Sequence, residues 1–519
     1  MNMVAVNNSI KDFYHELCSS GRPGRLGKVF KTESNYYFLD SGTGKVACLK
    51  ENVYKVLNCL MQSDSCEDLK DLDLNNEEIE NAINEIKEAV MAEHILSAPV
   101  LKTLTGSAVT HLRETLESGV ENVTLEVTEK CNLRCKYCIY NPSHKEYREF
   151  GHRDMSWETA KKAIDLLISH SKDAEQVHIG FYGGEPLLNF TLIKQAVGYA
   201  KSNFKEITFA MTTNAALVTD EIAEYLLQND FDIIVSLDGP EDIHDANRIT
   251  VEGTGSFNKT VTGAKNLLNT QSRLGKHSKI SFNMVVSGPN YEENYNKIQQ
   301  FLEHEDWIPE DIMVLTASVD HGPKDSAYFI PQGTQEREFT EGSYDPLNEW
   351  DWNCRRNKKN DNEKMGLFSD GVMDKGMLII HKRLLSEYPV KAYGMNGCCV
   401  PGQRRIYVTV DGKFLLCEKV GNIPDIGNVD TGFDFESIQK FYVDDFIDNA
   451  KEFCKDCWAV NLCTMCYVNC YDKKGPHFSF RHNSCRNERL YLENNLIRYH
   501  IALEENPEEL MEYNKKDFH

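Results

Sequence analysis

The sequence has 519 residues, with 57 basic and 80 acidic side chains and a formal net charge of −23. The length permits two to four domains, and the acidic balance argues against a nucleic-acid partner because such binding needs clustered cations. No apolar run approaches the roughly 20 residues that span a bilayer, and the N-terminus lacks the pattern of a signal peptide. We therefore expect a cytoplasmic protein that does not contact a membrane. In that reducing compartment disulfides are rare, so the 17 cysteines indicate metal binding or redox chemistry.

The first segment, residues 1–98, is predicted to be a small domain of its own. Residues 36–39 and 45–49 flank the turn sequence of residues 40–44, which predicts a β-hairpin. Two helical stretches follow, and the second repeats isoleucine and valine at helical spacing, at Ile79, Ile83, Ile86 and Val90. Residues 99–118 are expected to link this unit to the next.

Strand and helix patterns alternate through residues 119–320. Ser156 can cap a helix that presents Trp157, Ala160 and Ile164 on one face. The six predicted strands start near Val123 and continue at residues 177–182, 207–212, 231–236, 280–286 and 312–315. Six β/α units in this order predict an α/β fold with a parallel sheet or partial barrel and chemistry at the carboxyl ends of the strands.

The rest of the chain divides by composition. Residues 321–396 are charged and irregular, which indicates a bridge or insertion. Residues 397–490 hold nine cysteines, and residues 491–519 are predicted to form a C-terminal helix and tail.

A first group of cysteines, Cys131, Cys135 and Cys138, follows the first predicted strand with the spacing CxxxCxxC. Three thiolates at this spacing can hold one face of a 4Fe–4S cluster, which normally takes four cysteines, so one iron would remain open. The alternative is a zinc site, but zinc favours four closed ligands and paired CxxC units. The spacing therefore favours a cluster.

This loop, with aromatic Tyr137 before its third cysteine, resembles the radical SAM superfamily. Short motifs at the ends of the following strands occur in the same order as in that superfamily. They are the GGEP sequence at Gly183, Gly184, Glu185 and Pro186, the Thr213-Asn214 pair with Ala215 where glycine is usual, and the SLDG sequence of Ser236 and Asp238 with Arg248 downstream. Asn283 and Val285 on the fifth strand could face the cofactor or be structural.

The resemblance implies a partial (β/α)6 TIM-like barrel that holds a 4Fe–4S cluster with S-adenosyl-L-methionine (SAM). GGEP would hold the methionine amino group, and Ser236 and Arg248 would contact the ribose and carboxylate. A reduced cluster would then cleave SAM to methionine and a 5′-deoxyadenosyl radical, while the protein positions the cofactor and excludes competing reactions.

The second group of cysteines resembles the SPASM domain of radical SAM peptide maturases, which carries up to two auxiliary 4Fe–4S clusters. The family pattern implies that Cys454, Cys457, Cys463 and Cys485 hold an outer cluster, and that Cys399, Cys417 and Cys466 hold an inner one. The usual CxxxC is replaced here by CxxC to Cys466 and then Cys470, so either of these could be the ligand. Cys398 and Cys354 are candidate fourth ligands, or the inner cluster keeps an open iron. A zinc ribbon is the alternative for this segment.

Glu418 directly follows Cys417. In related SPASM enzymes an acidic residue here is thought to deprotonate the target side chain, so Glu418 is a candidate catalytic base. The alternative is that Glu418 is a solvated surface residue without a catalytic role.

The hairpin and helices of residues 1–98 resemble a winged-helix-like RiPP recognition element, which binds the leader of a precursor peptide by strand addition. As a whole the chain resembles maturases of cysteine-rich precursors, which implies thioether formation on a ribosomally made peptide. The expected partners are that precursor and an electron donor such as flavodoxin or ferredoxin. Carbon–carbon crosslinking, epimerisation and formylglycine formation are alternatives within the enzymes, and a non-catalytic iron–sulfur or zinc protein is the alternative outside them.

Overall fold

A computed structural model describes residues 7–19, 21–142, 148–286, 290–318, 346–356, 368, 376–395, 397–476 and 482–516. Much of the predicted bridge at residues 321–396 lies outside these ranges. Within the described residues, none of the helices combines the length and apolar composition that crossing a membrane requires.

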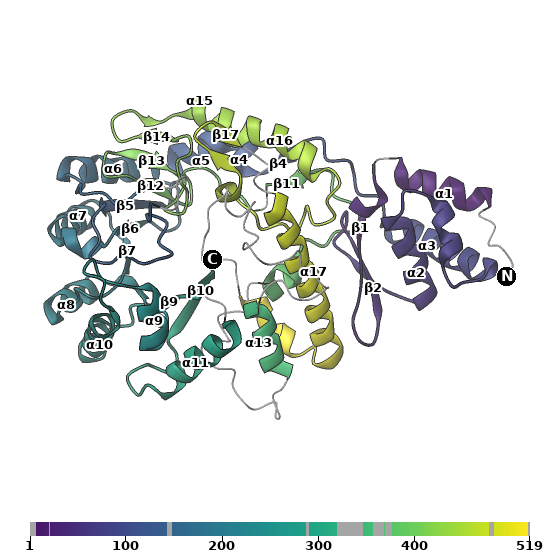
Figure 1. Cartoon of the computed structure of the whole chain (residues 1–519). Coiled ribbons are helices and arrows are strands. Elements are labelled where there is room, and N and C mark those ends of the chain that lie inside the picture. Colours follow the sequence, from purple (N-terminus) through teal and green to yellow (C-terminus); the bar gives the residue numbers. More distant parts are fainter. Residues whose placement is uncertain are drawn as a thin grey trace.

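Six parallel strands form the centre of the molecule, in the spatial order β10-β9-β8-β7-β6-β5 (Figure 1). The predicted α/β fold with a parallel sheet is confirmed, and β8 and β9 have the predicted bounds. The strands are β5 Asn122–Thr128, β6 His178–Gly183, β7 Thr208–Thr213, β8 Phe231–Ser236, β9 Ile280–Val286 and β10 Met313–Ser318. The helices between them are α6 Trp157–His170, α7 Phe190–Asn203, α8 Asp220–Gln228, α9 Glu241–Asn247, α10 Phe257–Leu274 and α11 Tyr291–His304.

Strand β5 is buried on both faces, as parallel strands covered by helices usually are. Val123, Leu125 and Val127 belong to the main hydrophobic core. The alternate row is polar but has protein partners: Glu126 accepts a hydrogen bond from Arg148, and Thr128 donates to Asp154. Helix α6 begins as predicted, with the Ser156 hydroxyl accepting from Thr159 N at 3.0 Å.

The cysteine-rich segment continues the same sheet, which its sequence pattern does not predict. Strand β12 (Ile406–Val408) pairs in parallel with β5, and an antiparallel meander follows through β13 (Lys413–Leu415), β14 (Gly427–Asn428) and β15 (Gly432–Phe433). Gly412 has φ +83° in the turn before β13, a conformation that glycine adopts without strain. This pairing places Cys417, which follows β13, beside the barrel.

The N-terminal segment folds into a three-stranded antiparallel sheet with helices. The predicted hairpin is present as β2 (Tyr36–Asp40) and β3 (Val46–Leu49), and β1 (Gly27–Lys31) adds a strand that the pattern does not predict. Three helices share a separate core with this sheet: α1 Asn8–Cys18, α2 Glu51–Gln62 and α3 Asn76–Glu93. Residues 104–118 between the two units carry β4 (Leu104–Thr105), α4 (Ser107–Thr110) and α5 (Leu112–Ser118).

Helix α17 (His482–Glu505) joins the N-terminal sheet to the cysteine-rich segment, and Figure 1 shows it beside β1. Phe30 and Tyr37 of the sheet pack around His500 of the helix. Glu504 accepts a hydrogen bond from the Tyr37 hydroxyl at 2.7 Å, and Lys28 pairs with Glu493 at 2.8 Å. The helix also begins near Cys485, so it connects the N-terminal sheet with one of the cysteines of the second group.

Candidate functional site

A cavity of about 480 Å³ opens at the carboxyl ends of the parallel strands. Its wall combines the cysteine loop with residues that follow β6, β7 and β8. Of the residues assigned from sequence, it brings together Cys131, Cys135, Tyr137, Cys138, Gly183, Gly184, Glu185, Thr213, Asn214, Ser236 and Arg248, and it also includes Asn283 and Val285.

Backbone contacts hold the cysteine loop in place. Arg134 N donates to Ile249 O at 2.7 Å, and Lys136 N donates to Asn247 O at 3.0 Å. Burial raises the pKa of the Cys131 thiol to about 12 and that of Cys138 to about 11. The raised pKa values mean that burying the charged thiolates costs free energy. Because metal ions bind the thiolate, coordination would offset that cost.

Glu185 follows β6, lines the cavity and hydrogen-bonds to the end of β7. Its carboxylate accepts from Thr213 Oγ1 at 2.7 Å, from Asn214 N at 2.8 Å and from Leu187 N at 3.2 Å. Burial raises its pKa to about 7 in spite of these donors. The side chain therefore fixes the positions of Thr213 and Asn214 in addition to lining the cavity.

Ala215 explains why glycine is usual after Thr213-Asn214. Its φ is +58°, in the left-handed region, and it is completely buried. An L-residue adopts this conformation at a cost of roughly 1–2 kcal/mol. The departure from the family pattern leaves the turn intact, since Thr213 and Asn214 still line the cavity.

Asp238 is the centre of a buried network beneath the cavity. Its carboxylate accepts from Arg248 Nη2 at 2.9 Å and from Val285 N at 2.9 Å, and the Tyr137 hydroxyl donates to it. Arg248 is 6% exposed, and its Nε is buried without a hydrogen-bond partner among the described residues. That orphan donor fits an anionic or polar group bound in the cavity.

Two of the residues that the sequence predicts to bind the cofactor, Asp238 and Pro186, do not line the cavity. Asp238 accepts from three protein donors, and Pro186 begins the short 3-10 helix Pro186–Asn189. Other lining residues have no local motif that could have identified them: Tyr140, Phe150, Tyr182, Thr316 and Lys419. Lys419 comes from the loop after β13, so only the pairing of β12 with β5 brings it here.

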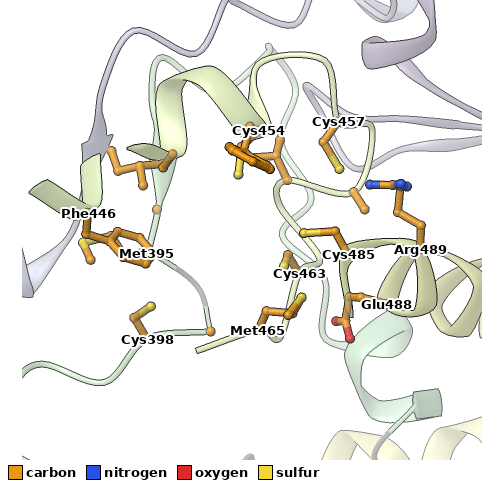
Figure 2. A pocket seen from close by; sticks show the side chains of 17 residues that line it. Met395, Cys398, Phe446, Cys454, Cys457, Cys463, Met465, Cys485, Glu488 and Arg489 are labelled. Atoms are coloured by element: carbon orange, nitrogen blue, oxygen red, sulfur yellow. The ribbon is translucent and has the colours of Figure 1, made fainter. Parts of the chain in front are cut away.

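A second cavity contains most of the later cysteines. Figure 2 shows Cys454, Cys457, Cys463 and Cys485 around it, together with Cys398. Phe446, Met395 and Met465 supply apolar walls, while Glu488 and Arg489 come from α17. Among the described residues, no three Cys, His, Asp or Glu side chains meet the geometry for holding a single metal ion.

The remaining cysteines of the second group, and Cys354, differ in how far they are buried and in which residues surround them. Cys466 contributes to the electrostatic surroundings of Cys417, whose pKa burial raises to about 12. Cys470 is completely buried, and its thiol donates to Tyr467 O at 3.8 Å. Cys399 is exposed beside Cys398 in a shallow pocket, and Cys354 lies on α13 (Pro346–Arg356) against the main core.

Glu418 is held by an arginine that the sequence pattern did not single out. Both of its carboxylate oxygens lie close to Arg405 Nη1, at 2.6 and 2.5 Å. The Glu418 side chain is 13% exposed and does not line the cavity around Cys131.

The family model described as the Radical SAM superfamily matches residues 125–300, which contain the cysteine loop and the strand ends described above. This chain contains a radical SAM domain. Radical SAM proteins use a 4Fe–4S cluster and SAM. The three cysteines and the orphan Nε of Arg248 fit these cofactors.

The chain is also similar to curated relatives and to a solved structure. The chain is 39% identical over 147 residues to an uncharacterised protein of Methanocaldococcus jannaschii, covering 28% of this chain and 48% of that protein. It is 27% identical over 290 residues to the radical SAM cyclopropyl synthase TigE of Paramaledivibacter caminithermalis, covering 54% of this chain and 60% of the relative.

A further relative is the cysteine-type anaerobic sulfatase-maturating enzyme of Clostridium novyi, 24% identical over 390 residues, or 72% of this chain and 94% of that enzyme. The solved structure described as native anSMEcpe with bound AdoMet aligns with a TM-score of 0.51 and 19% identity, covering 74% of this chain and 99% of that one. This structural likeness concerns the fold. The chain spans about half the length of the first two relatives.

Proposed function

We propose that this radical SAM enzyme modifies a ribosomally made, cysteine-rich precursor peptide and forms a sulfur-to-carbon thioether in it. One observation carries the proposal: the cysteine loop and residues of strands β6 to β10 line a single cavity, and the cysteine-rich segment contributes Lys419 to the same wall. A substrate held in that cavity would lie between the SAM site and the later cysteines.

The barrel residues would bind and orient the cofactor. Cys131, Cys135 and Cys138 would hold the 4Fe–4S cluster, and the backbone of Gly183 and Gly184 would face the methionine amino group. The orphan Nε of Arg248 would donate to the carboxylate or ribose. When bound and reduced, the cluster supplies one electron to SAM, which yields the 5′-deoxyadenosyl radical.

The proposed reaction removes two hydrogen atoms from the peptide. A peptide carbon loses a hydrogen atom to the adenosyl radical, and a cysteine thiol loses a proton. The sulfur then bonds to that carbon, and the one surplus electron leaves to an auxiliary site. We assign the outer auxiliary site to Cys454, Cys457, Cys463 and Cys485, which share a cavity.

The inner auxiliary site is assigned to Cys399, Cys417 and Cys466. The electrostatic influence of Cys466 on Cys417 supports Cys466 as the ligand of this site. Cys398 borders both the outer cavity and the pocket of Cys399, so it remains a candidate fourth ligand. For Glu418 to act as the base, its ion pair with Arg405 would have to open.

The N-terminal domain is proposed to bind the leader of the precursor as a winged-helix-like recognition element. Strand β3 is an edge of the three-stranded sheet, and its side chains are partly or fully exposed. An edge strand with free backbone groups can accept a peptide strand. An electron donor such as flavodoxin or ferredoxin would reduce the clusters.

A second candidate function is oxidation of a cysteine to formylglycine in a protein substrate. The observation that favours it is the match to 94% of the length of a cysteine-type sulfatase-maturating enzyme. The two reactions leave different products: a thioether peptide has lost two hydrogen atoms, whereas formylglycine has lost hydrogen sulfide and gained an oxygen.

The test is anaerobic reconstitution with iron and sulfide, followed by reduction in the presence of SAM and the product of any small cysteine-rich reading frame found beside the gene. We expect about 8–12 iron atoms per chain, release of 5′-deoxyadenosine, and a peptide lighter by two hydrogens. Cys135→Ala should abolish the release. Tightly bound zinc without iron would refute the enzyme assignment, and an unchanged peptide mass with an altered configuration would indicate epimerisation.

A further inference from the structure

One wall of the SAM cavity is built by a single residue of the cysteine-rich segment. Every other lining residue lies between positions 131 and 316, in the barrel strands and their loops, and only Lys419 comes from beyond them. Lys419 is exposed and stands two residues after Cys417. A substrate that lies between the SAM site and the later cysteines would therefore meet this side chain.

Among the described residues, Lys419 is also the lining cation that has no carboxylate partner, since Arg248 pairs with Asp238. Besides cysteines and tyrosines, the ionisable side chains of the wall are Glu185, Arg248 and Lys419. Three protein donors occupy Glu185, and Arg248 donates to Asp238. Among the described residues, the Lys419 ammonium makes no hydrogen bond or ion pair.

The neighbouring carboxylate does not neutralise Lys419. Both oxygens of Glu418 lie within 2.6 Å of Arg405 Nη1, so that charge already has a partner. The closest acidic residue in sequence is thus unavailable to the lysine unless the Arg405 pair opens. The wall facing the SAM site consequently presents, at Lys419, a positive charge that has no ion-pair partner among the described residues.

We propose that Lys419 recognises a carboxylate of the substrate peptide, close to the residue that is modified. This inference rests on the proposed function, because it assumes that a peptide enters the cavity. A charge in a partly enclosed site interacts more strongly than one on an open surface, since the effective dielectric constant is lower. A cationic residue at the same place in the peptide would be repelled. The carboxylate could be an Asp or Glu side chain or the C-terminus of the peptide.

The test uses the reconstituted full-length holoenzyme with SAM and synthetic probes. The probes are acetylated, amidated pentapeptides of sequence Gly-Xaa-Gly-Cys-Gly, in which Xaa is Asp, Asn or Lys, and the Asn peptide with a free C-terminal carboxylate. Binding is followed by the change in the electron paramagnetic resonance (EPR) spectrum of the reduced, SAM-bound enzyme, and turnover by 5′-deoxyadenosine release. The Asp peptide should bind about tenfold more tightly than its Asn counterpart.

Substitutions of Lys419 then decide the assignment. Lys419→Gln should remove the preference for Asp, and Lys419→Glu should shift it towards the Lys peptide. Lys413→Gln is the matched control, because Lys413 lies outside this cavity, 3.9 Å from Asp425, and the preference should survive its loss. Tighter binding of the Asn peptide with a free C-terminus, lost in Lys419→Gln, would also support the proposal and identify the C-terminus as the source.

Equal binding of the Asp and Asn peptides, including no binding of either, would overturn the inference, as would a preference that persists in Lys419→Gln. Failure of the proposed function gives a different result. In that case the full-length precursor would not become lighter by two hydrogens when treated with the holoenzyme, SAM and reductant, whatever the short probes show.

Discussion

Arg248 Nη2 lies 2.9 Å from Asp238 Oδ1, and both side chains are buried. The same carboxylate accepts from Tyr137 of the cysteine loop and from Val285 N of β9. Asp238 therefore positions a cavity-lining arginine and the cluster loop together, although it does not line the cavity itself. Its proposed role is positional rather than cofactor contact.

Asp238→Asn should weaken SAM binding while leaving iron content unchanged. The amide keeps the shape of the side chain but removes the charge that holds Arg248, and unpairing a buried ion typically costs about 3–5 kcal/mol. We expect the dissociation constant of SAM to rise about tenfold or more, measured by the EPR change on titrating SAM into reduced enzyme. Unchanged SAM affinity would show that Arg248 is held without Asp238.

Gly263→Ala should destabilise the barrel. A Cβ on Gly263 of α10 would lie 1.9 Å from the backbone carbonyl oxygen of Ala215, so the turn after Asn214 would have to move. Overpacking of this kind costs about 1–3 kcal/mol of unfolding free energy, and urea denaturation measures it.

Gly198→Ala in α7 is the matched control for that substitution. Outside its own helical turn, no described atom lies within 4 Å of the added Cβ, and replacing a helical glycine by alanine should stabilise by about 0.5–1 kcal/mol. If both alanine variants changed stability in the same direction, the close approach of α10 to Ala215 would be refuted.

Acid should loosen the contact between α17 and the N-terminal sheet through His500. Burial lowers the pKa of His500 from its ordinary value of 6.5 to about 4. The unfolded chain therefore binds a proton that the folded chain does not, so His500 destabilises the fold as the pH falls from about 6.5 to 4. The slope is at most about 1.4 kcal/mol per pH unit.

His500→Gln should flatten this part of the stability profile, whereas His277→Gln, at an exposed position, should leave it unchanged. Thermal denaturation at several pH values provides the measurement. A profile as steep in His500→Gln as in the wild type would assign the acid sensitivity to other groups.

Cys466 and Cys470 should differ in iron binding. If Cys466 is the inner ligand, Cys466→Ala loses up to about four iron atoms per chain on reconstitution. Cys470→Ala should keep the iron and lower stability by about 1 kcal/mol, because it removes a buried thiol from the core. Iron analysis with EPR of the reduced protein checks both, and loss of iron in Cys470→Ala instead would reverse the assignment.

The sequence by itself was enough to identify those candidate site residues that are recognised by short spacing along the chain or by their place at the end of a strand. Cys131, Cys135 and Cys138 are close along the chain, and Glu185, Asn214 and Ser236 each stand at the end of a hydrophobic strand. Because parallel strands bring their carboxyl ends to one edge, the strand pattern was enough to predict a shared site. The hairpin of β2 and β3 followed from local turn chemistry in the same way.

Only the tertiary structure decided which distant residues complete that site. The pairing of β12 with β5 brings Lys419 to the cavity, and the packing around Asp238 places its carboxylate against three protein donors. Burial separates Cys470 from Cys466, although both have ligand-like spacing. These outcomes depend on contacts between segments far apart in the chain, and neither periodicity nor motif spacing encodes such contacts.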